Sequence, residues 1–137
     1  MLGPKVIALL ALSGAAGTLC RVFVVGVLAS RLASGSDPRF PWPTFAVNLM
    51  GCLVAGLLAG LVTGVWLERT PDDRVRFVVA AGFLGAFTTF SAFGLETFEL
   101  LRAGAKWQAG AYAAASVVGG LAMVAIGWLL SQTLASR

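Results

Sequence analysis

The chain has 137 residues, of which 58% are hydrophobic and only 12% are charged, and its mean hydropathy is +0.89. A soluble domain of this size needs more polar surface, so the composition favours a membrane protein. The chain has no histidine, and its two cysteines, Cys20 and Cys52, lie in apolar stretches. We interpret both as small apolar residues, because two such cysteines suggest neither a disulfide framework nor a metal site. These features argue against a metalloenzyme and a serine hydrolase.

Four long apolar blocks follow one another along the chain, and a bilayer crossing needs about 20 apolar residues per helix. Backbone groups in lipid must bond internally, so we expect each block to be a helix. The expected helices cover about residues 5–30, 42–66, 74–101 and 107–134, joined by short polar loops. We expect Pro71 to stop the second helix, and Asp72 or Asp73 to cap the third. Residues 1–137 are therefore predicted to form a single all-α integral membrane domain with four transmembrane helices.

Basic residues divide almost equally between the two sides of the membrane. With four helices, one side carries Lys5, Arg69, Arg74, Arg76 and Arg137, and the other carries Arg31, Arg39, Arg102 and Lys106. An excess of Lys and Arg normally fixes the orientation of a membrane protein. The near balance leaves two alternatives: a subtle bias toward one orientation, or insertion both ways with pairing of inverted copies. The net charge of +4 fits contact with anionic lipid headgroups and does not require nucleic-acid binding.

Several polar side chains fall inside the apolar blocks, where charged groups are costly and often functional. Arg21 in the first block either attracts anions or extends its side chain to the interface, and Glu96 lies late in the third block. Asn48 either joins helices through a hydrogen bond or faces a water-filled cavity. Tyr112 and Ser116 are four residues apart, so they share one face of the fourth helix.

Glycines recur along the second block. Gly56 and Gly60 have the GxxxG spacing that lets helices approach closely. We interpret this pair as a structural interface between helices.

The stretch GFLGAFTTFSAFGLE, residues 82–96, combines two glycines, hydroxyl groups and aromatic rings inside the third block. The glycines and the Thr88–Thr89 pair weaken a helix, so we expect the third helix to be broken in mid-membrane, where freed carbonyls can bind a cation. Phe90 and Phe93 can present positive ring edges to an anion beside these hydroxyls. From periodicity alone, simple packing of the rings is the stronger alternative.

Three motifs, GAAGTLCR, TFAVNLMGC and GFLGAFTTFSAFGLE, resemble the Fluc fluoride channels, also called CrcB proteins, over almost the whole chain. The resemblance implies an antiparallel dual-topology homodimer with two fluoride pores in a bacterial inner membrane. It also implies passive export of cytoplasmic fluoride, with a structural sodium ion at the dimer centre. The implied partners are fluoride, sodium, the lipid bilayer and an inverted copy of the chain, and no nucleic acid.

The resemblance assigns roles to individual residues. It places the sodium ion on the backbone carbonyls of Gly85 and Thr88, and the edges of Phe90 and Phe93 against fluoride. The other residues that it places along the fluoride path are Arg21, Thr44, Asn48, Thr89, Ser91, Glu96, Tyr112 and Ser116.

Two positions depart from the family pattern. Ala92 and Gly120 stand where a hydroxyl group is common in the family. The polar path is therefore expected to be shorter or more hydrated.

Other classes of protein fit the sequence less well. Small multidrug transporters also have four helices and exchange cationic drugs for protons, but they use a glutamate in the first helix, where this chain has Arg21 and no acid. A purely structural protein does not need so many polar groups in its spans. An intramembrane enzyme is the least favoured class, because no nucleophile with a neighbouring base is visible.

Overall fold

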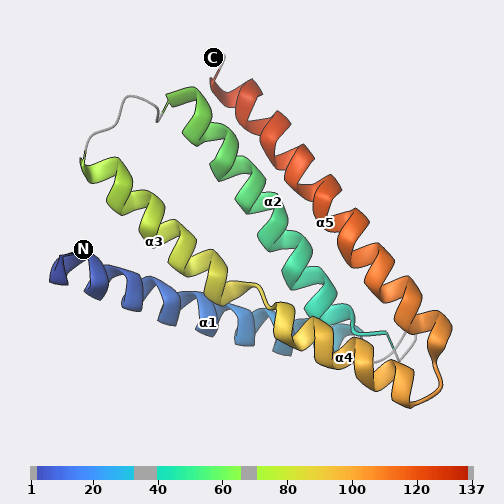
Figure 1. Ribbon diagram of the computed structural model, residues 1–137. Helices are drawn as coiled ribbons and strands as arrows, with labels where there is room; N and C mark the ends of the chain where they lie inside the picture. Colours follow the sequence, from blue (N-terminus) through green and yellow to red (C-terminus); the bar gives the residue numbers. More distant parts are fainter. Residues whose placement is uncertain (1–2, 33–39, 66–70, 136–137) are drawn as a thin grey trace.

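The computed structural model describes residues 3–32, 40–65 and 71–135, and within these ranges the secondary structure is helical (Figure 1). The helices are α1 (Pro4–Leu32), α2 (Trp42–Val65), α3 (Pro71–Phe87), α4 (Phe90–Arg102) and α5 (Lys106–Ala135). The all-α class expected from the sequence is confirmed. Three spans are long and apolar enough to cross a membrane: Pro4–Arg31, Trp42–Leu61 and Lys106–Leu134. The chain is therefore a multi-pass membrane protein.

The third apolar block holds two helices, α3 and α4. Each is shorter than the roughly 20 residues that a bilayer crossing needs. They are separated by Thr88 and Thr89, and the Thr89 backbone is extended, with φ −150° and ψ 111°. The helix is thus broken at the threonine pair, as the sequence led us to expect.

One boundary prediction was wrong. Asp72 and Asp73 do not cap the third helix, because both lie inside α3, which begins at Pro71. The end of the second helix lies outside the described residues, since α2 is described as far as Val65. Proline suits the first position of α3, because the first N–H of a helix has no partner within the helix and the ring fixes a helical φ.

The helices pack as two pairs, with α5 along α2 and α1 along α3 (Figure 1). Glycines bring α2 and α5 together. A Cβ on Gly56 would overlap the backbone of Val124, one on Gly60 would overlap the Ser131 hydroxyl, and one on Gly127 would overlap the backbone of α2. The interface predicted from the GxxxG spacing is therefore confirmed.

Glycines also bring α1 and α3 together, over a shorter stretch of the two helices. A Cβ on Gly17 would overlap the Phe83 carbonyl, and one on Gly82 would lie 2.7 Å from Ser13 Oγ. The backbones of α1 and α3 therefore approach closely just before the break, so packing against α1 fixes the position of α3 there.

A small apolar core closes the end where α4 turns into α5. It contains the buried residues Leu100, Ala105, Ala109 and Tyr112. Gly104, with φ 75°, allows the chain to reverse there. This turn places α4 against the first half of α5, beside α2.

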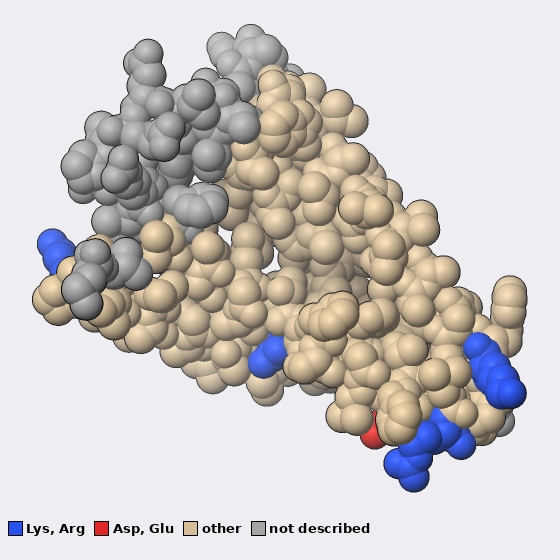
Figure 2. Space-filling model, viewed as in Figure 1, with Lys and Arg blue, Asp and Glu red and all other residues tan. Residues whose placement is uncertain are grey.

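The surface in view is mainly uncharged, and Lys and Arg side chains gather over the α4–α5 turn (Figure 2). Glu99, Arg102 and Lys106 are exposed in this region. The near balance of basic residues stays a prediction, because it depends on side chains outside the described residues, those of Arg39, Arg69, Arg74, Arg76 and Arg137.

Candidate functional site

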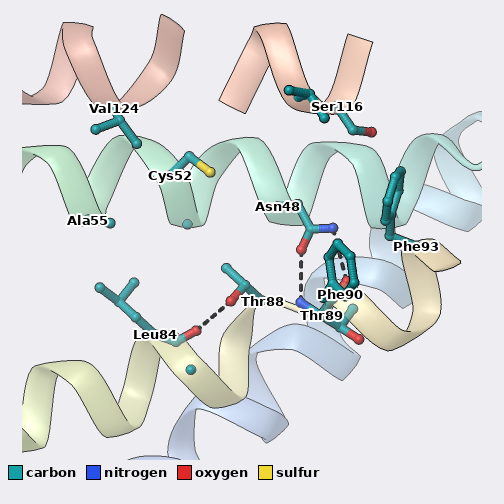
Figure 3. Close-up of a pocket in the computed structure, with 13 residues that line it drawn as sticks. Asn48, Cys52, Ala55, Leu84, Thr88, Thr89, Phe90, Phe93, Ser116 and Val124 are labelled. Atoms are coloured by element: carbon teal, nitrogen blue, oxygen red, sulfur yellow. Dashed lines mark hydrogen bonds between the residues drawn. The ribbon is translucent and has the colours of Figure 1, made fainter. Parts of the chain in front are cut away.

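A side chain of α2 holds the α3–α4 break in place (Figure 3). Asn48 Oδ1 accepts a hydrogen bond from the Thr89 N–H at 2.8 Å, and Asn48 Nδ2 donates to the Thr89 carbonyl at 3.2 Å. The amide therefore satisfies both backbone groups of one residue. On the α3 side, the N–H and the hydroxyl of Thr88 both donate to the Leu84 carbonyl at 2.9 Å. The backbone around the break is thus fixed from both sides.

Two backbone carbonyls lose their helical donors at the break. In a continuous helix, the Thr89 N–H would bond to the Gly85 carbonyl, and the Ala92 N–H to the Thr88 carbonyl. Here Thr89 donates to Asn48, and Ala92 donates to Thr89 Oγ1 at 3.2 Å, which caps α4. The two carbonyls that lose these donors are those that the family resemblance assigns to sodium.

Open space adjoins Gly85 and Thr88. A Cβ on Gly85 would have no neighbour within 4 Å. A cavity of about 380 Å³ lies beside the break, between α2, α3, α4 and α5 (Figure 3). Its wall brings together seven of the residues singled out from the sequence, Asn48, Gly85, Thr88, Thr89, Phe90, Phe93 and Ser116.

The rings of Phe90 and Phe93 lie next to one another at the start of α4. Their centroids are 5.5 Å apart and their planes are inclined by 43°. Phe90 is 84% exposed, whereas Phe93 packs on Tyr112 with a centroid distance of 5.2 Å. Phe93 is therefore part of the wall and of the core, while Phe90 has a face free for another contact.

Three more of the predicted residues meet in a second cluster, at the Glu96 carboxylate. Thr44 Oγ1 donates to Glu96 Oε1 at 2.6 Å, and the Tyr112 hydroxyl donates to Glu96 Oε2 at 2.7 Å. Hydrogen bonds to a carboxylate are stronger than those between neutral groups. The cluster joins α2, α4 and α5. Glu96 also lines a second cavity of about 410 Å³, toward the α4–α5 turn.

The sequence that forms the helix break and the cavity beside it matches a known family. The family model of the CrcB-like proteins, described as Camphor Resistance (CrcB), covers residues 8–128. The chain belongs to the CrcB family.

Relatives with a stated function are similar over most of this CrcB chain. A protein named fluoride-specific ion channel FluC from Methylobacillus flagellatus is 47% identical over 122 residues, covering 89% of this chain and 91% of the relative. A protein of the same name from Novosphingobium aromaticivorans is 41% identical, covering 93% of this chain and 97% of the relative. Another from Rhizobium etli is 45% identical, covering 86% of this chain and 87% of the relative.

The remaining predicted residues of the CrcB chain lie in different surroundings. Ser91 is adjacent to the break, with its hydroxyl 3.2 Å from that of Thr89. Arg21 is half-buried on α1, and is not part of the wall of the cavity beside the break. Arg21 is therefore outside the set of predicted residues that share this cavity.

The sequence analysis did not predict every residue of the cavity wall. Cys52 is one that it assigned only as a small apolar residue of a span, and it lines the cavity. Its position four residues after Asn48 was the available signal, because residues at that spacing share a helix face.

Proposed function

We propose that this CrcB protein is a fluoride-selective channel through which cytoplasmic fluoride leaves the cell passively. The observation that carries the proposal is its 47% identity, over 89% of the chain, to a relative named a fluoride-specific ion channel. A membrane potential that is negative inside drives an anion outward, so the export needs no other energy source. On this proposal the protein performs no enzymatic reaction.

The chemistry of the cavity supports conduction of a small anion. Among the described residues, its wall contains amide, hydroxyl and thiol groups and aromatic rings, but no charged side chain. Ring edges and neutral donors replace part of the water around an anion without binding it as tightly as a cation would. A conducting site needs this intermediate strength, because the ion must also leave.

A second, inverted copy of the chain completes the pore in this proposal. Phe90, Leu95 and Phe98 are 84%, 59% and 57% exposed, which leaves an apolar face on α4 for a partner. The near balance of basic residues in the sequence favours insertion in both orientations. Contact between two such faces would bring the two helix breaks together at the centre of an antiparallel homodimer.

A sodium ion bound between the two breaks would have a structural role. The carbonyls of Gly85 and Thr88 suit it, because carbonyl oxygens are ligands for hard cations and both have lost their helical donors. The ion would supply positive charge that holds four carbonyl oxygens of two subunits together. Asn48 and Thr89 keep those oxygens available by engaging the amides that would otherwise bond to them.

Fluoride release from liposomes tests the function. Vesicles that contain the purified protein and fluoride are treated with valinomycin to carry potassium, and a fluoride electrode follows release, with chloride-loaded vesicles as the control. We expect rapid fluoride release and little chloride release. A folded, dimeric protein that releases no fluoride would contradict the proposal, and exchange of cationic drugs for protons would be assayed next.

The sodium proposal has its own measurement. Replacing sodium by N-methylglucamine during purification is expected to weaken the dimer, with loss of flux, and returning sodium is expected to restore both. In a sodium gradient, the reversal potential of the fluoride current should not follow sodium. A reversal potential that did follow it would mean that sodium is transported.

A further inference from the structure

The end of α3 lies against a glycine of α2. Gly51 is buried and lies three residues after Asn48, so the two residues share a face of that helix. A Cβ on Gly51 would overlap Thr88 Cγ2, the methyl group of the first threonine at the break. Helix α2 therefore contacts both threonines of the break, Thr89 through the Asn48 hydrogen bonds and Thr88 through this close approach.

The hydroxyl of Thr88 determines where its methyl group points. Thr88 Oγ1 donates to the Leu84 carbonyl at 2.9 Å, which holds the side chain in one rotamer (Figure 3). In this rotamer the methyl group lies over Gly51. The Thr88 N–H donates to the same Leu84 carbonyl, also at 2.9 Å. The position of the methyl group is therefore linked to the position of the Thr88 backbone.

One methyl group decides whether a side chain fits at position 51. The next nearest atoms to an added Cβ would be Thr88 Cβ at 3.6 Å and Phe87 Cδ1 at 3.7 Å, both at ordinary contact distances. At Gly56, by contrast, an added Cβ would overlap backbone atoms of Val124. A second substitution that removes the Thr88 methyl group can therefore relieve the overlap at Gly51, whereas no side-chain substitution relieves the one at Gly56.

We propose that Gly51 is a positioning residue for the helix break, where it receives the Thr88 methyl group and so sets the place of the Thr88 carbonyl. The inference rests on the proposed function, in which the Thr88 carbonyl is one of the sodium ligands. Gly51 does not touch the ion in this proposal. It acts through Thr88, just as Asn48 acts through Thr89.

Sodium titration of the purified protein measures this role without depending on fluoride flux. Sodium chloride replaces N-methylglucamine chloride at constant ionic strength, and thermal unfolding and cross-linked dimer are followed, because an ion that binds the folded protein stabilises it. Gly51→Ala should raise the sodium concentration for half of the full effect about tenfold. Gly110→Ala is the matched control and should leave it unchanged, because a Cβ there has no neighbour within 4 Å.

A double variant separates the methyl contact from general damage to α2. Thr88→Ser keeps the hydroxyl that bonds to Leu84 and removes the methyl group. Alone it should raise the half-effect sodium concentration about threefold, because the contact with Gly51 is lost. Gly51→Ala together with Thr88→Ser should need less sodium than Gly51→Ala alone, since the new methyl group replaces the one removed. Fluoride efflux should follow the same order.

Two results would overturn the role of Gly51. One is a folded Gly51→Ala protein with the sodium response of the wild type. The other is a double variant that needs as much sodium as Gly51→Ala. If Gly51→Ala yields no folded protein, the double variant decides: a folded double variant that responds to sodium supports the role, and an unfolded one overturns it. A wild-type protein that does not respond to sodium would contradict the sodium proposal itself, and this inference with it.

Discussion

The α2–α5 pair and the α3–α4 break both contain glycine in apolar helices, with opposite results. Between α2 and α5, Gly56 and Gly127 meet the backbone of the facing helix. At the break, Gly85 faces open space, and its carbonyl has lost its helical donor. The close approach of α2 and α5 needs glycine at these positions, whereas a side chain would fit at Gly85. The comparison teaches that the role of a glycine in a membrane helix depends on what lies opposite it.

The largest effect on stability is expected at Gly56, where α2 lies against the backbone of α5. In Gly56→Val the new side chain meets the backbone of Val124, which cannot move aside as a flexible side chain can. We expect the free energy of unfolding to fall by about 3 kcal/mol or more, and the yield of folded protein in size-exclusion chromatography to drop. Gly110→Ala on α5 is the matched control, because a Cβ there has no neighbour within 4 Å. Normal folding of Gly56→Val would show that the two helices separate easily.

The next effect is expected at the side chain that holds the break. Asn48→Ala leaves the N–H and carbonyl of Thr89 without partners, which should lower the free energy of unfolding by about 3 kcal/mol and reduce fluoride efflux. Thermal unfolding in detergent and the liposome assay measure the two effects. Thr97→Val is the control, because among the described residues the Thr97 hydroxyl bonds within α4, to the Phe93 carbonyl. If both variants changed thermal unfolding and fluoride efflux by the same amount, Asn48 would not be what holds the break.

Substitutions of Phe90 and Phe93 should have different effects on fluoride efflux and on stability. Phe90→Ile removes a positive ring edge at an 84% exposed position, so efflux should fall about tenfold while the dimer persists. Phe93→Ile should lower efflux and also stability, because this ring packs on Tyr112. Dimer content by cross-linking accompanies both assays. Wild-type efflux in both folded variants would exclude the ring-edge role.

The smallest effect is expected in the Glu96 cluster. Tyr112→Phe removes the donor of Glu96 Oε2 and should cost about 2 kcal/mol of stability. Thr44→Ser keeps the hydroxyl that donates to Oε1 and should change stability little. Thermal unfolding of both variants tests this, and an effect of Thr44→Ser as large as that of Tyr112→Phe would argue against the hydrogen bonds as its cause.

The sequence was sufficient to predict features that depend on local composition. Apolar length predicted the helices, the Thr88–Thr89 pair predicted the break, and the spacing of Gly56 and Gly60 predicted a close interface. The start of α3 was missed, because Pro71 can either follow one helix or begin the next.

Features that depend on contacts between distant segments could not be predicted from the residues. Asn48 and Thr89 are 41 positions apart, and the structure shows that Asn48 joins helices. Asn48 also lines the cavity, but its role toward water there stays a prediction. The resemblance named Thr44, Glu96 and Tyr112 one by one, but only the packing of three helices shows that the hydroxyls share one carboxylate.

The hydrogen bonds of Asn48 also bear on how the chain is assembled in the membrane. Before α2 lies beside α3, the Thr89 N–H has no asparagine to bond to, and lipid offers no substitute. Until then its available partner is the Gly85 carbonyl, so we expect the newly inserted segment to cross as one continuous helix. On this expectation the break forms when the helices dock, and the third span is a simple membrane helix before that.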